Sequence, residues 1–359
     1  MFAAKLTGPL LLGLLLVSGC ASFNASRQDK IYQEVLYLTT REDTGKSDPG
    51  ERFAGERGKT RYGAAMVAID PEPVLSAFSV AQTNRLMQRP QLPRRQALQK
   101  IQPLQKDAFM EAIGRYSMDR EVPEDILIFI HGYKRSFADS VENAARLRYQ
   151  LAFPGPAIAF SWPSTDSVSG YLADVENLDW SVPALRDLIE GMGERFPHTR
   201  LHLVAHSLGN RALLQLLAEL LQNDQEADRL PIGQLVLIAP DFDRDIFMRD
   251  VAPELHRLPF RKTLYVSSED FPLMASGKVF QYPRLGDSRE LPPIIKGVET
   301  IDVSDAINVF NGHGYYEANR ATIEDLYFLI RENKPAHERP GLIQVETDEG
   351  PYWRLQPVM

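Results

Sequence analysis

The sequence contains a single cysteine, Cys20, among its 359 residues. One cysteine cannot form an intramolecular disulfide or build a metal site from several thiolates. Long apolar runs are also lacking, because Leu10–Val17 is far shorter than the roughly 20 residues that span a bilayer. Basic clusters are lacking too. The formal net charge is -8 and the lysines and arginines are scattered, which argues against a nucleic-acid partner.

The N-terminus resembles a bacterial lipoprotein signal. A positive charge and a short apolar run precede the sequence VSGC, which ends at Cys20. We therefore predict a signal peptide over residues 1–19, lipidation of Cys20, and a membrane tether over residues 20–30. The protein is then expected in the bacterial cell envelope, and Ala21 favours the outer membrane if the host is Gram-negative. An uncleaved anchor, or an ordinary signal peptide with a chance cysteine, is the alternative.

Short apolar strands alternate with helical stretches along most of the remaining chain. This alternation predicts an α/β fold with a mostly parallel central sheet and helices on both faces, in one domain over residues 31–334. Residues 335–359 are expected to be a tail, with a hairpin as one option. The segments expected as strands are Ile31–Thr40, Tyr62–Ile69, Asp125–Ile130, Ala157–Phe160, Leu201–Ala205, Gln234–Ala239, Lys262–Ser267 and Val298–Val303. The segments expected as helices are Phe109–Ser117, Ser140–Gln150, Val182–Phe196, Ala212–Leu221 and Ala321–Glu332.

Ser207 lies in the strongest motif of the chain. An apolar strand precedes it and a helix follows it at once, which is the context of a nucleophile elbow. The strained turn requires small residues two positions to either side, and Ala205 and Gly209 stand there. The pattern predicts a serine nucleophile, although Ala205 replaces the usual glycine.

A serine nucleophile needs a histidine base, and His313 is the best candidate. It follows the last expected strand in a loop with glycine on both sides, the position that the chain order serine, acid, histidine requires. The other histidines occupy less suitable places, before the serine, inside the elbow, in a charged helix-like stretch or in the tail. They are His131, His198, His202, His206, His256 and His337.

The third member of a triad is an acid that orients the base. Asp270 ends the expected strand Lys262–Ser267 in the sequence SED, and we favour it. Asp241 and Asp243, one strand earlier in the sequence APDFD, are the alternatives.

An oxyanion hole needs two backbone N–H groups that point at the developing negative charge. We expect one from Leu208, directly after the nucleophile. We expect the other from Tyr133, because the pair His131 and Gly132 follows the strand Asp125–Ile130 and glycine allows a tight turn there.

These motifs resemble an uncharacterised bacterial family within the lipase and esterase superfamily of α/β-hydrolases. The resemblance covers roughly residues 31–330 and implies the α/β-hydrolase fold and a Ser207–Asp270–His313 triad, but no particular substrate. The segments that carry it are Ile126–Phe137, Phe160–Pro163, Ala205–Arg211, Ala239–Asp243, Leu264–Asp270, Arg284–Asp287 and Gly312–His313.

The resulting hypothesis is a lipid-anchored serine hydrolase that cleaves a lipid or a small ester through an acyl-enzyme. Such chemistry needs no metal and no cofactor. Trp162, Tyr171 and Tyr133 are candidates for an acyl pocket or for packing around the elbow, and residues 164–170 and 271–286 are expected to be irregular. An envelope acyltransferase and a non-catalytic binding or scaffold module remain the alternatives.

Overall fold

The computed structural model describes residues 30–69, 97–116, 125–165, 167–221, 231–306 and 313–357. The predicted signal peptide, Cys20 and all of the tether except residue 30 lie outside the described residues. No helix within the described ranges is long and apolar enough to cross a membrane.

The core of the molecule is one sheet of eleven strands in the order β10-β11-β9-β8-β7-β6-β4-β5-β1-β2-β3. The eight strands from β11 to β1 in this order are all parallel to their neighbours. At one end β10 pairs antiparallel with β11, and at the other end β2 pairs antiparallel with both β1 and β3. The predicted fold class is therefore confirmed. The strands are β1 (Ile31–Asp43), β2 (Phe53–Ile69), β3 (Leu98–Leu104), β4 (Ile126–Ile130), β5 (Ala157–Ser161), β6 (Leu201–His206), β7 (Ile232–Ile238), β8 (Arg261–Val266), β9 (Glu299–Asp302), β10 (Leu342–Thr347) and β11 (Gly350–Leu355).

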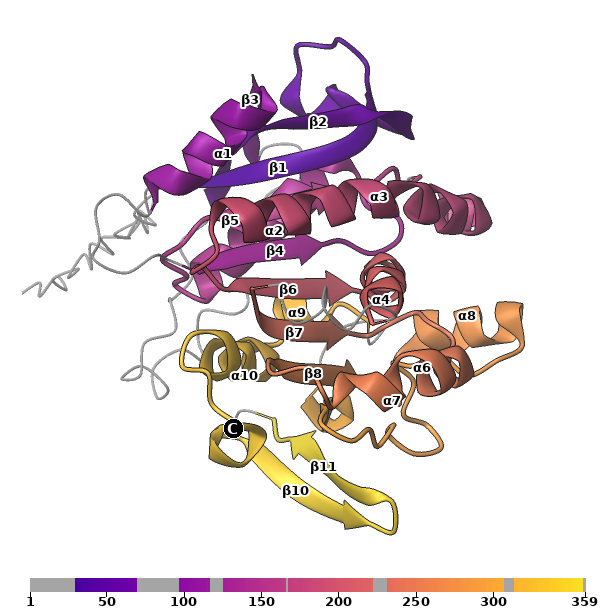
Figure 1. Cartoon of the computed structure of the whole chain (residues 1–359). Coiled ribbons are helices and arrows are strands. Elements are labelled where there is room, and N and C mark those ends of the chain that lie inside the picture. Colours follow the sequence, from indigo (N-terminus) through magenta and orange to yellow (C-terminus); the bar gives the residue numbers. More distant parts are fainter. Residues whose placement is uncertain are drawn as a thin grey trace, which may run out of the picture.

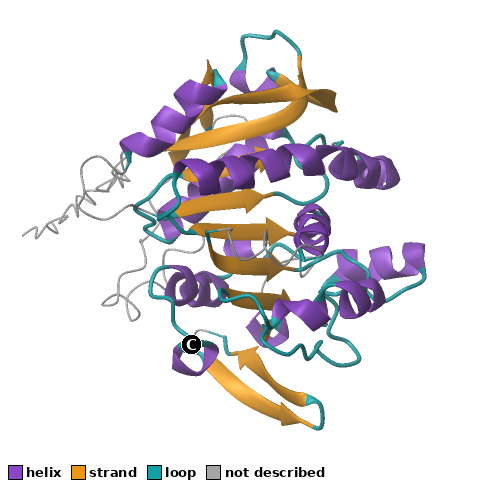
Figure 2. Cartoon of the chain, viewed as in Figure 1, coloured by secondary structure: helices purple, strands orange, loops and turns teal. Residues whose placement is uncertain are grey.

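Helices cover both faces of the sheet (Figure 2). Alternate residues of a buried strand point to opposite faces, so Ile128 of β4 joins one apolar cluster and Phe129 joins the other. The first cluster contains residues of α1, α3, α4, α6 and α7, and the second contains residues of α2, α9 and α10. The helices are α1 (Lys106–Arg115), α2 (Phe137–Gln150), α3 (Tyr171–Arg195), α4 (Gly209–Leu220), α6 (Arg244–Asp250), α7 (Ala252–Leu255), α8 (Phe271–Phe280), α9 (Tyr315–Ala318) and α10 (Arg320–Ile330).

The order of the strands predicts at which edge of the sheet the functional site lies. β4 lies between β5 and β6, so the chain leaves β4 toward one side of the sheet and later returns to its other side. Ligands of such sheets bind at the carboxyl ends of the strands, beside this change of direction. In Figure 1, the arrowheads of β4 and β6 point to the edge where α4, α6 and α8 lie.

Two segments near the N-terminus differ from the sequence-based expectation. The strand expected from Tyr62 begins nine residues earlier as β2, at Phe53, and Leu98–Leu104 forms β3, which was not among the expected strands. Both stretches are largely exposed and polar, so they lack the apolar alternation that identifies a strand. Pro103 is tolerated because β3 is an edge strand.

Two helices also differ from the expectation. Residues 271–286 were predicted to be irregular, yet α8 begins at Phe271 with Asp270 as its N-cap and proline in its first turn, both ordinary helix starts. The helix predicted from Val182 begins eleven residues earlier at Tyr171, because Pro183 lies inside α3 without ending it.

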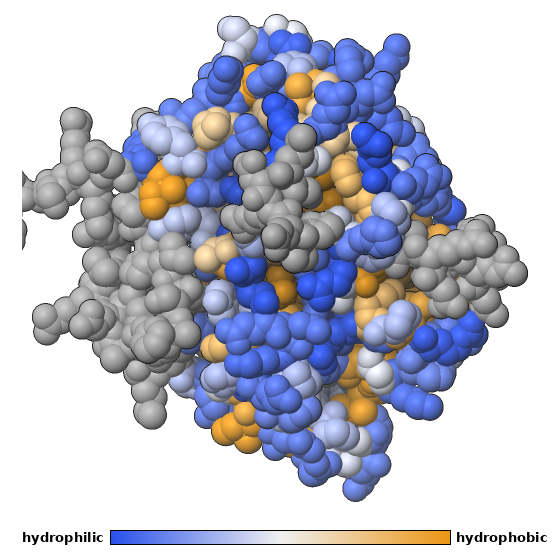
Figure 3. Space-filling model, turned by 60° about the vertical axis from the view of Figure 1, so that its left-hand side comes forward, coloured by the Kyte–Doolittle hydropathy of each residue, from blue (hydrophilic) through white to orange (hydrophobic). Residues whose placement is uncertain are grey.

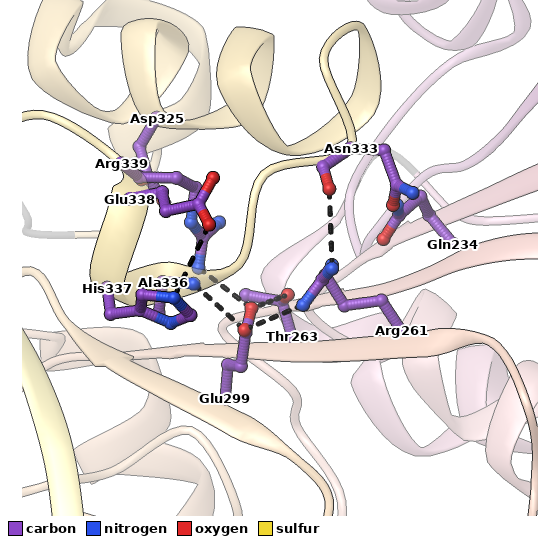
Figure 4. Close-up of polar contacts among 10 residues, drawn as sticks. All are labelled: Gln234, Arg261, Thr263, Glu299, Asp325, Asn333, Ala336, His337, Glu338 and Arg339. Atoms are coloured by element: carbon purple, nitrogen blue, oxygen red, sulfur yellow. Dashed lines mark hydrogen bonds and ion pairs between the residues drawn. The ribbon is translucent and has the colours of Figure 1, made fainter.

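The C-terminal tail forms the hairpin β10–β11, and β11 extends the central sheet by pairing in parallel with β9. Buried ion pairs tie this tail to the rest of the fold (Figure 4). Arg339 contacts Glu299 of β9 at 3.1 Å and Asp325 of α10 at 3.2 Å. Within the sheet, the partly exposed Arg261 of β8 also contacts Glu299, at 2.9 Å. The face of the molecule drawn in Figure 3 is mostly hydrophilic, with apolar residues in smaller patches.

Candidate active site

Ser207 occupies the sharp turn between β6 and α4. Its φ of 53° lies in the left-handed region, which non-glycine residues adopt at a cost of about 1–3 kcal/mol. Hydrogen bonds hold this turn: the Ser207 N–H donates to Ile238 at 2.9 Å, and the Asn210 side chain donates to both the Ser207 and the Ile238 carbonyl oxygens. The elbow is therefore held by β7 together with the Asn210 side chain of α4.

Two glycines allow the loop after β4 to approach this turn. A Cβ on Gly132 would lie 2.8 Å from the Ser207 Cβ, and a Cβ on Gly209 would lie 2.4 Å from the His131 carbonyl oxygen. Both distances are too short for real side chains, so only glycine permits this packing. The close approach brings the backbone around Tyr133 to the same edge as Ser207 and Leu208, which precede the first turn of α4.

His313 and Asp270 meet although 43 residues separate them in the chain. The His313 Nδ1 lies 2.9 Å and 2.8 Å from the two Asp270 carboxylate oxygens. Burial lowers the pKa of His313, but the Asp270 carboxylate outweighs it, so the pKa of His313 stands above its usual value. Asp270 is itself held in place, because its Oδ1 accepts a hydrogen bond from the Leu273 N–H at the start of α8.

The two alternative acids make other contacts. Asp241 forms a buried ion pair with Arg284 at 2.7 Å and accepts hydrogen bonds from Ser276 and Tyr171. Asp243 caps α6 by accepting from the Ile246 N–H at 3.0 Å. Of the three candidates, Asp270 is the one that the structure pairs with His313.

Several contacts brace the predicted oxyanion loop. Trp162 is fully buried, stacks on the His131 ring at 4.9 Å and donates its Nε1–H to the His131 carbonyl oxygen at 2.8 Å. Of the two roles considered for Trp162, the structure assigns packing. Tyr133 donates its hydroxyl to the Ser167 carbonyl oxygen at 2.8 Å and meets the Tyr171 ring edge-on at 5.1 Å.

Sequence reasoning missed the arginines that support this loop. Arg41 of β1 is buried, and one of its guanidinium nitrogens donates to the Arg135 carbonyl oxygen at 2.6 Å. The side chain of Arg135 forms an ion pair with Glu317 of α9, four residues after His313. Neither arginine stands in a recognisable motif for this task, because each acts through residues that are distant in sequence.

The described residues contain no group of histidine, cysteine, aspartate and glutamate side chains that could hold a metal ion.

Comparison with known proteins identifies the family. Residues 106–327 match the family described as alpha/beta hydrolase of unknown function (DUF900). The chain belongs to this family. A curated relative, the uncharacterized protein alr1448 of Nostoc sp. (strain PCC 7120 / SAG 25.82 / UTEX 2576), is 21% identical over 290 residues, which is 68% of this chain and 74% of the relative.

Two solved structures are also similar. One is the product of the gene lin2722 from Listeria innocua, with 16% identity, 65% of this chain and 99% of that chain covered, and a TM-score of 0.37. The other comes from a study of two fungal esterases from Rhizomucor miehei, with 12% identity, 84% of both chains covered and a TM-score of 0.36. At TM-scores this low, neither similarity adds to the assignment, which rests on the family match and the observed topology.

Proposed function

We propose that this α/β hydrolase is a serine esterase that works through an acyl-enzyme on Ser207. The observation that carries the proposal is the pair of contacts between His313 and Asp270, at 2.9 Å and 2.8 Å. The same His313 also contacts His206, the residue directly before the strained Ser207. A histidine held by a buried carboxylate next to a serine in this turn is the arrangement that activates a hydroxyl group.

The contact with Asp270 also determines which nitrogen of His313 acts as the base. A carboxylate only accepts hydrogen bonds, so the Nδ1 of His313 must carry the proton. In the neutral ring the Nε2 is then unprotonated and takes the proton of Ser207 as the hydroxyl attacks the ester carbonyl. The same nitrogen returns that proton to the leaving alcohol, and water repeats the sequence to release the acid.

The negative oxygen of the tetrahedral intermediate needs hydrogen-bond donors. In the proposal these are the backbone N–H groups of Leu208 and Tyr133. Leu208 stands at the N-terminus of α4, where unpaired N–H groups and the helix dipole favour a negative charge.

The surface beside the site favours an ester with an apolar acyl group. Tyr133, Tyr171 and Phe280 form a row of rings at 5.1 Å and 5.9 Å that leads from the oxyanion loop to α8. Of the ten large apolar side chains that are exposed in the described ranges, seven belong to the start of α3, to α6, to α8 or to the segment after α8. They are Leu172, Ile246, Met248, Phe271, Val279, Tyr282 and Leu291.

Fluorophosphonate labelling tests this proposal, together with turnover of p-nitrophenyl esters of graded chain length. We expect the purified protein to be labelled and Ser207→Ala to lose both labelling and turnover. Ser140→Ala is the matched control, because Ser140 is equally buried but lies in α2. Failure of the folded wild-type protein to react would favour the non-catalytic binding module. Efficient transfer of the acyl group to an added alcohol would favour the acyltransferase.

We further propose that the protein is anchored to the bacterial envelope through a lipid on Cys20. The support is the sequence before and at that cysteine. Metabolic labelling with palmitate tests it, and Cys20→Ala should abolish the label and release the protein from the membrane fraction. A labelled Cys20→Ala protein would contradict the proposal.

A further inference from the structure

His206 precedes the nucleophile directly, at the end of β6, and its side chain contacts the segment that carries the base. Its Nε2 lies 3.1 Å from the carbonyl oxygen of His313, although 107 residues separate the two. The rings of His206 and His313 lie 4.7 Å apart, and the ring of Tyr316, three residues further along, lies 4.6 Å from that of His206. His206 therefore packs between two side chains of one short segment.

The contact determines the protonation of His206. A carbonyl oxygen only accepts a hydrogen bond, so the Nε2 of His206 must be the donor. The Nδ1 is buried and has no hydrogen-bond partner among the described residues, and a Cβ on Gly132 would lie 3.0 Å from it. Burial, reinforced by the nearby His313 and Arg135, places the pKa of His206 well below its usual value. The ring is thus neutral at physiological pH.

We propose that His206 is a positioning residue that holds the backbone of His313 at the distance from Ser207 that proton transfer requires. His206 ends β6 and Ser207 follows it directly, so a bond from His206 to His313 ties the base to the nucleophile through only a few covalent bonds. Asp270 orients the ring of His313 from one side, and His206 fixes its main chain from another. This inference rests on the proposed esterase function.

Two substitutions separate the hydrogen bond from the packing. His206→Phe keeps an aromatic ring but loses the donor, whereas His206→Gln keeps an amide N–H that can reach the same carbonyl oxygen. We expect His206→Phe to lower kcat for a p-nitrophenyl ester by about 10- to 100-fold with little change in KM, since small misplacements of reacting groups have effects of this size. His206→Gln should recover most of that loss.

His202 provides the matched control. It lies on the same strand, is equally buried and also forms a hydrogen bond, but to Asp125 at the other end of β6. His202→Phe should affect the thermal unfolding midpoint without lowering kcat. Equal kcat values for the wild type and a folded His206→Phe protein would overturn the positioning role.

A measurement on the wild-type protein avoids any question of folding. Nitrogen NMR shifts of His206 should show a neutral ring with its proton on Nε2 at neutral pH, and a proton on Nδ1 would contradict the proposal. The esterase proposal is tested independently of the role of His206. It is contradicted if the wild-type protein neither reacts with fluorophosphonate nor turns over an ester.

Discussion

At the scale of single residues, the carboxylate beside His313 controls the charge of the proposed base. Burial alone would lower the pKa of His313, and Asp270 reverses this by stabilising the protonated ring. The proposed reaction requires the unprotonated ring, so kcat/KM should rise with pH and level off above a pKa that exceeds the usual histidine value.

We expect Asp270→Asn to lower kcat by about 10⁴-fold, because the amide no longer enforces the productive tautomer. The loss of the negative charge should also move the acid limb of the pH–rate profile to lower pH, since protonated His313 is no longer favoured. Asp243→Asn is the control: asparagine caps α6 as well as aspartate does, and full activity should remain. If Asp243→Asn is the inactive variant, the acid has been assigned to the wrong residue.

At the scale of elements, the site depends on how closely the loop after β4 meets the start of α4. Gly209→Ala would place a methyl group 2.4 Å from the His131 carbonyl oxygen, which must shift. We expect a loss of about 1–3 kcal/mol in the free energy of unfolding, measured in urea. Gly114→Ala, in α1, meets its nearest atom at 3.8 Å and should be neutral or slightly stabilising. Equal stability of both variants would contradict the close approach.

A second connection between elements links the oxyanion loop to α9 through Arg135 and Glu317. The Arg135 cation disfavours protonated His313 and so opposes Asp270. Arg135→Gln should therefore raise the pKa of His313 and move the acid limb of kcat/KM to higher pH. Arg320→Gln removes a similarly buried ion pair, with Glu324 in α10, and should leave the limb in place. If the acid limb of kcat/KM moves to lower pH in Arg135→Gln, the Arg135 cation does not lower the pKa of His313.

At the scale of the whole molecule, the C-terminal tail is part of the main sheet and not an appendage. Arg339 joins it to β9 and α10 through Glu299 and Asp325, and both Arg339 and Asp325 are almost completely buried (Figure 4). Burial raises the pKa of Asp325 even though Arg339 opposes that rise. A buried carboxylate of this kind is costly without its cation.

We expect Arg339→Met to lower the free energy of unfolding by about 3–5 kcal/mol near neutral pH. The loss should shrink as the pH falls, because Asp325 then takes up a proton and no longer needs a positive partner. Arg354→Met removes an exposed ion pair with Asp305 and should cost at most about 1 kcal/mol. Urea unfolding of the wild type and Arg339→Met at pH 5 and pH 8 measures this loss of free energy. A loss that is larger at pH 5 than at pH 8 would contradict the prediction.

The sequence by itself determined the fold class and drew attention to Ser207, Asp270 and His313, because these depend on local signals: apolar runs of strand length, small residues around a serine, and polar residues at strand ends. It did not reveal β3, whose residues are largely exposed, or α8, whose short stretch lacks a clear apolar periodicity. Tertiary structure alone decided which aspartate meets His313, that Trp162 packs against His131, and that His206, Arg41 and Arg135 brace the site. Each of these is a contact between residues far apart in the chain, and such contacts exist only once the strands have been placed in their order.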